Sequence, residues 1–158
     1  MERPGPVEPE GVFDGLRWSP ILRGAVLDNV LSFVAMLPIA LYLAGPDAFS
    51  EDEESASQAI EGAAAEPEFL LWSFVVGGAV TVYAGYWAAR RAGVFHLRHG
   101  GWTAVASALL ASLFLLAPGA TAGTAPPIWY DALSLALIVP AGVLGGWLAR
   151  ARGARGRS

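Results

Sequence analysis

The stretch FLLWSFVVGGAVTVYAGYWAARRAG, residues 69–93, joins a largely apolar run without charged residues to a pair of arginines. A helix needs about 20 residues to cross a hydrocarbon core of roughly 30 Å, and the run has that length. Arg90 and Arg91 follow at the point where such a helix would leave the membrane. The stretch therefore predicts a membrane-spanning helix over residues 69–89.

Three further apolar runs of similar length predict spans over residues 21–44, 101–118 and 128–149. The composition agrees, because 54% of the residues are hydrophobic and only 15% are charged, which is too little polar surface for a soluble domain of this size. The predicted fold class is an all-α membrane protein with four transmembrane helices arranged as two helical hairpins.

The positive charges orient this pattern. All ten basic residues are arginines, and they occur before the first run, between the second and third, and after the fourth. Arginine-rich short loops are retained in the cytoplasm during insertion, so both termini are expected on the cytoplasmic side. The absence of lysine, with heavy use of Ala, Gly and Arg, indicates a GC-rich prokaryotic genome. The expected location is the prokaryotic cell membrane, inner or plasma, with several passes.

The segments around the spans differ in composition. Residues 1–16 are rich in proline and glycine and predict a flexible cytoplasmic arm, followed by a transmembrane domain over 17–150. The loop 45–68 is strongly acidic and is expected outside the cell, with a short surface helix or a mobile segment at 55–65. Residues 151–158 form a basic cytoplasmic tail, expected to be disordered and able to lie against anionic headgroups.

The ends of the second and fourth predicted helices share a motif. Five positions match at a constant offset of sixty residues: Gly85, Trp87, Ala89, Arg90 and Gly93 with Gly145, Trp147, Ala149, Arg150 and Gly153. Such a match fits a duplicated hairpin with parallel repeats, as occurs in transporters. It equally fits two helices that independently use small residues, an interfacial tryptophan and stop-transfer arginines, and both interpretations remain open.

Small residues predict where the helices touch. Close approach of helices in lipid depends on small side chains, because apolar burial gives little driving force there. We expect packing within the bundle, more than between molecules, at these positions: Gly77, Thr81, Gly85, Ala89, Gly142, Gly145 and Gly146.

Asp28 is the one ionisable residue well inside a predicted span. A charge at this depth costs a few kcal/mol on insertion scales, so Asp28 should face other helices, a water-filled crevice or a partner. Asn29 is adjacent and Ser32 shares the helical face of Asp28, which makes these three residues a candidate intramembrane polar site. Asp28 is either an interhelical hydrogen-bond anchor or a proton or cation site, with Arg23 or Arg98 as counter-charge.

Sites for other chemistry are not indicated. There is no cysteine, no nucleophile elbow, no phosphate-binding glycine loop and no zinc-protease motif, so neither a catalytic residue nor a cofactor is predicted. His96 and His99 are an incomplete metal site without further ligands. The acidic loop lacks the ligand spacing of a calcium loop. Nucleic-acid binding is not expected, because the orientation of the helices in the membrane already accounts for the arginines.

Several short motifs carry a family resemblance over residues 17–150. These are Leu22-Arg23-Gly24, Ala84-Gly85-Tyr86-Trp87-Ala88-Ala89-Arg90, His99-Gly100-Gly101 and Gly145-Gly146-Trp147-Leu148-Ala149-Arg150. The chain resembles small glycine-rich four-helix prokaryotic integral membrane proteins of unknown function. The resemblance implies the four-helix fold and supplies no catalytic residues.

Two function classes follow. The first is a non-enzymatic membrane scaffold or accessory subunit, whose partners are the bilayer and a membrane protein or a second copy of the chain. The second is a small, oligomeric transporter or channel that uses Asp28 as its intramembrane polar site. One deep acid without a second is a weak signature for proton relay, so the sequence favours the scaffold.

Overall fold

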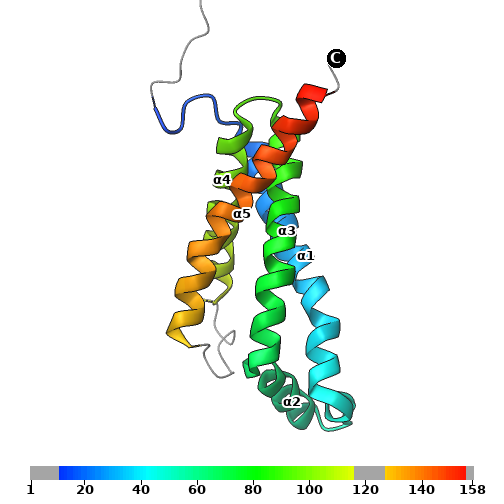
Figure 1. Cartoon of the computed structure of the whole chain (residues 1–158). Coiled ribbons are helices and arrows are strands. Elements are labelled where there is room, and N and C mark those ends of the chain that lie inside the picture. The colour runs from blue at the N-terminus through cyan, green and yellow to red at the C-terminus, as the bar shows by residue number, and fades with distance from the viewer. Residues whose placement is uncertain (1–10, 116–126, 156–158) are drawn as a thin grey trace, which may run out of the picture.

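A computed structural model describes residues 11–115 and 127–155, and within these ranges the chain is helical without strands. The elements in chain order are α1 (Trp18–Ala44), the 3-10 helix η1 (Gly45–Phe49), α2 (Glu53–Ala65), α3 (Pro67–Ala92), α4 (His96–Leu115) and α5 (Ile128–Arg155). Four long helices, α1, α3, α4 and α5, form a bundle, and α2 lies at one end of it (Figure 1).

Three of these helices are long and apolar enough to cross a membrane, and they mark the chain as a multi-pass membrane protein. They are α1 with η1 (Trp18–Phe49), α3 (Pro67–Ala92) and α5 (Ile128–Gly153). The helix at the third predicted span, α4, begins at His96 rather than at 101, and its first turns carry His96, Arg98 and His99. These polar residues lower its mean hydropathy, and its expected end at 118 lies outside the described residues.

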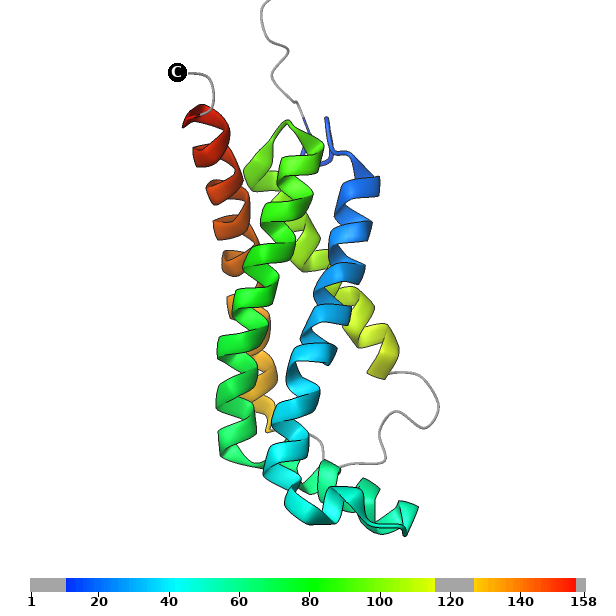
Figure 2. The same cartoon turned by 90° about the vertical axis from the view of Figure 1, so that its right-hand side faces the viewer.

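The two ends of the bundle differ in their charged residues. The arginine end is formed by the start of α1, the end of α3, the start of α4 and the end of α5, and it carries Arg17, Arg23, Arg90, Arg91, Arg98, Arg150 and Arg152. The opposite, acidic end holds η1 and α2 with the acids of residues 47–68. Figure 2 shows α1 and α3 side by side along the bundle, with α2 across their acidic ends.

The segment expected as a surface helix or mobile loop is helical. Asp52 caps α2, because its carboxylate accepts a hydrogen bond of 3.1 Å from the backbone N–H of Ser55 and another from the Ser55 hydroxyl. A side-chain acceptor at this position satisfies a backbone donor that has no partner within the helix. The same hydrogen bonds hold the pKa of Asp52 below its usual value.

At both ends of the described chain, residues outside the predicted transmembrane domain take part in the fold. Residues 11–16, expected within a flexible arm, are held on the bundle, since the ring of Phe13 lies 5.0 Å from Trp102 and 6.2 Å from Trp18. Arg98 also donates to the carbonyl oxygen of Gly11. At the other end, α5 continues to Arg155 and takes up the first part of the expected disordered tail. Residues 1–10 and 156–158 lie outside the described residues.

Small side chains fill the interior of the bundle and large ones cover its outside. The buried apolar residues are mostly alanines, including Ala25, Ala84, Ala88, Ala89, Ala104 and Ala149, whereas Phe33, Leu113 and Phe114 are each more than 60% exposed. In water this arrangement would be unfavourable, but in lipid the outer side chains contact acyl chains while the small inner ones let helix backbones approach.

The closest approaches occur in the arginine half, at glycines of α3, α4 and α5. A Cβ atom added at Gly85 would lie 2.7 Å from the carbonyl oxygen of Gly142, and one added at Gly145 would lie 2.6 Å from the backbone nitrogen of Tyr86. Gly100 and Gly146 lie against each other in the same way. These contacts are within the chain, and their obstacles are backbone atoms, so only glycine fits without moving a helix.

Gly77 departs from its expected packing role. A Cβ added at Gly77 would meet no atom within 4 Å, and the same holds for its neighbour Gly78. Both glycines border a cavity instead of a second helix. The remaining positions of the predicted α3 stripe, Thr81, Gly85 and Ala89, are buried.

Candidate functional site

Asp28 lies at the junction of three helices. It is only 2% exposed, and its carboxylate accepts hydrogen bonds from the hydroxyl groups of Thr81 on α3 and Ser107 on α4. The Thr81 oxygen is 3.1 Å from Oδ1 and 3.2 Å from Oδ2, and the Ser107 oxygen is 2.5 Å from Oδ2. Asp28 therefore joins α1 to both of its neighbours.

Asn29 extends this junction into a chain of hydrogen bonds that all donate toward Asp28. Its amide nitrogen donates to the carbonyl oxygens of Ala25 and Ser107, and to the Ser107 hydroxyl at 2.9 Å. Because that hydroxyl accepts from Asn29, its own hydrogen is available to Asp28. The chain of donors therefore runs from Asn29 through Ser107 to Asp28, with Thr81 as a second donor.

Neither arginine considered as a counter-charge, Arg23 or Arg98, contacts Asp28. Arg98 is turned toward the chain start, where its guanidinium donates to Gly11 and lies 5.7 Å from the centre of the Phe95 ring. Arg23 is exposed at the arginine end. Among the described residues, the carboxylate oxygens of Asp28 are hydrogen-bonded by neutral hydroxyl groups alone.

A cavity of about 490 Å³ extends from Asp28 toward the acidic end. Polar side chains from all four long helices border it: Asp28, Asn29, Ser32, Ser73, Thr81, Ser107, Tyr130 and Ser134. Gly77 and Gly78 provide room, because a larger side chain at either position would project into open space. Ser32, the third predicted site residue, borders the cavity one turn beyond Asp28.

In the part of the cavity farther from the arginine end, a further hydrogen bond joins two helices, α3 and α5. The Ser73 hydroxyl donates to the carbonyl oxygen of Leu70 at 2.7 Å, so it accepts from the Tyr130 hydroxyl, which is 2.6 Å away. The Tyr130 ring also lies 4.8 Å from that of Phe74. These contacts fix the start of α5 against the outer half of α3.

His99 has a structural role that the sequence did not predict. It is fully buried, and its Nε2 atom accepts a hydrogen bond of 2.9 Å from the backbone N–H of Arg17, the residue that precedes α1. Its Nδ1 atom lies 3.2 Å from the carbonyl oxygen of Phe95. Both ring nitrogens are thus engaged by the backbone, so His99 ties α1 to α4 and is not poised as a metal ligand beside His96.

His96 lies at the arginine end and is partly buried there. Burial lowers the pKa of His96 below its usual value, and the nearby His99 and Arg150 lower it further. Burial is the larger cause, because removing water from the imidazole disfavours its charged form.

The structure brings together some of the predicted site and adds residues to it. Asp28 and Asn29 belong to one network, whereas Thr81, predicted as a packing residue, is a hydrogen-bond donor to Asp28. Neither Ser107 nor Tyr130 was predicted for the site. Hydroxyl groups on two predicted helices were visible in the sequence, but only the helix register shows which of them meet Asp28.

Comparison of the chain with protein families, with curated proteins and with solved structures found no match.

Proposed function

We propose that the chain is a four-span integral protein of a prokaryotic cell membrane with both termini in the cytoplasm. The gathering of arginines at one end of the bundle and of acids at the other supports this orientation. The contacts of α4 with α1, α3 and α5 support a fourth span, as does the absence of charged residues from 101–115.

The absence of cysteine allows a direct test of this topology. Single cysteines are introduced at Ser19 and Val94 near the arginine end and at Ser57 and Pro127 toward the acidic end, all of them exposed. A membrane-impermeant maleimide should label the Ser57 and Pro127 variants in intact cells, and the Ser19 and Val94 variants only after lysis. Labelling of Val94 and Pro127 from the same side would exclude a crossing by α4.

We further propose that the protein acts as a non-enzymatic scaffold or accessory subunit in the membrane. The observation that carries this proposal is the engagement of Asp28, its one deep acid, with hydroxyl groups of two other helices. The glycine contacts between α3, α4 and α5 leave backbones touching in the arginine half. Asp28 links three helices by hydrogen bonds, and the arginine half of the bundle beside it is tightly packed. This arrangement favours a structural role over a pathway for ions or solutes through a single molecule.

The exposed apolar side chains are consistent with partners in the bilayer. The test is extraction in a mild detergent followed by size measurement and identification of bound chains. The proposal expects a stable complex, with a membrane-protein partner or a second copy, that survives dilution. Recovery of the monomer alone from membranes at native abundance would contradict it.

The cavity beside Asp28 favours a second candidate function, the oligomeric transporter or channel. Eight polar side chains and two glycines border a space of about 490 Å³ in the outer half of the bundle. Under this hypothesis Asp28→Asn abolishes flux of ions or solutes into liposomes, and Gly78→Leu, which fills the cavity, does the same. Ser57→Ala, on α2, is the control. No flux in the parent protein would exclude transport, and flux in Asp28→Asn and Gly78→Leu equal to that of the parent would exclude this cavity as the pathway.

A further inference from the structure

Three polar side chains of α1 come together at one end of the cavity beside Asp28. The Asp28 carboxylate and the Asn29 amide contact the same Ser107 hydroxyl, at 2.5 and 2.9 Å, so these two side chains lie next to each other. Ser32 follows Asp28 by four residues, on the same face of the helix, and also borders the cavity. We call the part of the cavity bordered by Asp28, Asn29 and Ser32 its polar end.

The polar end has hydrogen-bond acceptors to spare. A carboxylate has about four lone-pair sites, and the hydroxyl groups of Thr81 and Ser107 bring two hydrogens to Asp28. The amide oxygen of Asn29 and the hydroxyl oxygen of Ser32 accept no hydrogen bond from another described residue, and both side chains are partly exposed. Acceptor positions therefore remain on all three side chains of α1.

The polar end also carries a negative charge without a counter-charge. None of the described residues that border the cavity is basic, and the donors to Asp28 are neutral hydroxyl groups. Buried ions in proteins are ordinarily paired, because an unpaired charge in an apolar environment is costly. An ammonium group would supply both the missing charge and three N–H donors for the remaining acceptors.

The rest of the cavity is apolar and opens on one side. Its apolar lining includes Phe74, Val82, Leu137, Ile138 and Leu144. The bordering residues of α1 and α3 are buried or partly buried, whereas Ala111 on α4 and Leu137 and Leu144 on α5 are exposed. Figure 2 shows the later part of α4 diverging from the first half of α5. In a membrane this open side faces acyl chains, so a ligand that enters through it needs an apolar body.

We propose that the cavity binds a lipophilic primary amine as its ammonium ion. Asp28 is the ion-pair partner, Asn29 and Ser32 accept the other two N–H hydrogens, and the alkyl part lies along the apolar lining. The volume of about 490 Å³ falls within the range of roughly 300–1,000 Å³ that is usual for small-molecule sites. The proposal deepens the transporter hypothesis by naming its substrate class, and it rests on the same cavity.

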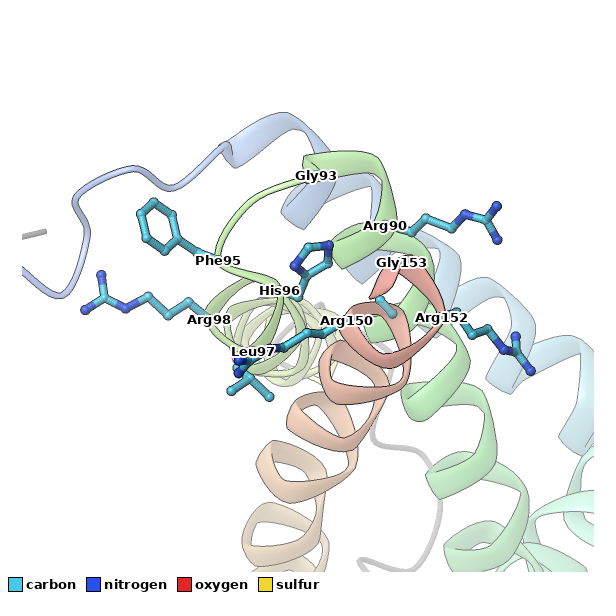
Figure 3. Close-up of a pocket in the computed structure, with 10 residues that line it drawn as sticks. Arg90, Gly93, Phe95, His96, Leu97, Arg98, Arg150, Arg152 and Gly153 are labelled. Atoms are coloured by element: carbon cyan, nitrogen blue, oxygen red, sulfur yellow. The ribbon is translucent and has the colours of Figure 1, made fainter. Parts of the chain in front are cut away.

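The arginine end does not offer a competing site for such a cation. A second cavity, of about 770 Å³, lies there, and Arg90, Arg98, Arg150 and Arg152 border it without an acidic residue among its described lining. In Figure 3, Arg98 lies on one side of this space and Arg90 and Arg152 lie on the other. Their positive charges repel an ammonium ion. We therefore expect one bound amine per chain.

The first test uses the purified full-length protein in neutral detergent micelles. Binding of radiolabelled octylammonium to immobilised protein is measured against protein-free micelles, with octanol as the neutral competitor and methylammonium as the competitor without an apolar body. Octylammonium should saturate one site, and each competitor should bind at least about 10-fold more weakly. Equal affinity for octanol would overturn the role of the charge, and equal affinity for methylammonium would overturn the role of the apolar lining.

Two variants locate the site. Asp28→Asn should weaken octylammonium binding by roughly 10- to 100-fold, from the loss of a charge-assisted hydrogen bond, and should leave octanol binding within about threefold. Gly78→Leu should weaken octylammonium binding by roughly 10-fold or more, because the added side chain enters the open space of the cavity. Thermal unfolding without ligand shows that each variant is folded, and the comparison of competitors in the parent needs no variant.

Each variant has a matched control. Asp131→Asn makes the same change at an exposed acid of α5, and Ala79→Leu enlarges an exposed neighbour of Gly78, and neither residue borders the cavity. Both should keep octylammonium affinity within about threefold, since exposed charges are screened and an outward side chain leaves the cavity open. A loss in these controls equal to that in Asp28→Asn and Gly78→Leu would overturn the assignment to this cavity.

Binding in micelles and flux in liposomes are measured separately, so the two hypotheses fail in different ways. Saturable octylammonium binding that depends on Asp28, without flux of any solute, would support the amine site and contradict transport. Flux of another solute through the protein, without octylammonium binding, would overturn the amine site and leave transport standing.

Discussion

Thr81 on α3 donates a hydrogen bond to Asp28 on α1 across a separation of 53 residues in the chain, at 3.1 Å. Both residues are buried, so the hydroxyl replaces water that the carboxylate would otherwise bind. The pair joins the two helices of the first hairpin at a defined register.

Replacement of Thr81 by valine tests the contribution of that hydrogen bond with little change of volume. Thr81→Val should lower the free energy of unfolding by roughly 1–2 kcal/mol, the upper range for interhelical hydrogen bonds in membranes. Thr81→Ser keeps the hydroxyl and should stay closer to the parent. Reversible unfolding in mixed micelles measures both, and equal stability of the valine variant and the parent would show that the hydrogen bond contributes nothing net.

A single methyl group should distinguish the packed glycines from those at the cavity. In Gly145→Ala the added Cβ meets the backbone of Val82 and Tyr86, so α3 and α5 must separate. This overpacking should lower the free energy of unfolding by roughly 1–3 kcal/mol. Gly77→Ala adds the same methyl to α3 in open space and should be neutral or slightly stabilising, because alanine favours helix. Thermal unfolding of both variants gives the comparison, and a similar loss at both positions would refute the assignment of contacts.

Acidification should destabilise the arginine end through His96. Its pKa is lowered in the folded protein, first by burial and then by His99 and Arg150, so the folded state binds fewer protons than the unfolded state. The stability is unaffected above the unfolded pKa of about 6.5 and falls as the pH drops toward the folded value. His96→Gln should remove this part of the pH dependence. An unchanged slope of unfolding free energy against pH between about 7.5 and 5 in that variant would rule out His96 as its source.

The cap of α2 makes a prediction for the acidic end. The pKa of Asp52 is lowered by its hydrogen bonds from Ser55, so the capping contribution is present above the unfolded pKa of about 3.9 and is lost as the pH falls through the folded value. Asp52→Ala should speed amide hydrogen exchange in the first turn of α2 at neutral pH. Asp52→Asn keeps a capping oxygen, so its amide hydrogens in the first turn of α2 should exchange more slowly than those of the alanine variant. Equally fast exchange in both variants would assign the effect to the charge of Asp52 alone.

The positions of the helices were predictable because length and hydropathy determine them. α1 and α3 extend only a few residues beyond the predicted 21–44 and 69–89, and α5 starts at the predicted 128. The start of α4 was missed by several residues, since polar residues from His96 to Gly100 resemble a loop by composition. In the structure they are helical, and the backbones of Arg17 and Phe95 engage both ring nitrogens of His99.

The partners of the polar site depend on information that a single helix does not contain. Asp28 and Asn29 were recognisable as polar groups in an apolar run, but the choice of Thr81 and Ser107 as their partners depends on rotation and register between helices. The glycine contacts set that register, because backbones meet only where neither helix has a side chain. The four-residue repeat of small residues on α3 predicted packing at both Gly85 and Gly77. Only Gly85 packs against another helix, whereas Gly77 borders the cavity.

The hydrogen bonds of Asp28 have a consequence for how the protein is made. α1 is synthesised first, so Asp28 is present in the chain 53 residues before Thr81 and 79 residues before Ser107. A lone acid at the centre of a membrane-spanning helix costs roughly 2.5–3.5 kcal/mol to insert, and Asp28, which lies between the start and the middle of α1, costs less than that. The nascent α1 therefore carries this cost until α3 arrives, and the second hydroxyl is supplied only by α4. Completion of the site is in this way a late event of biosynthesis, which couples the final placement of the first helix to translation of the third long helix.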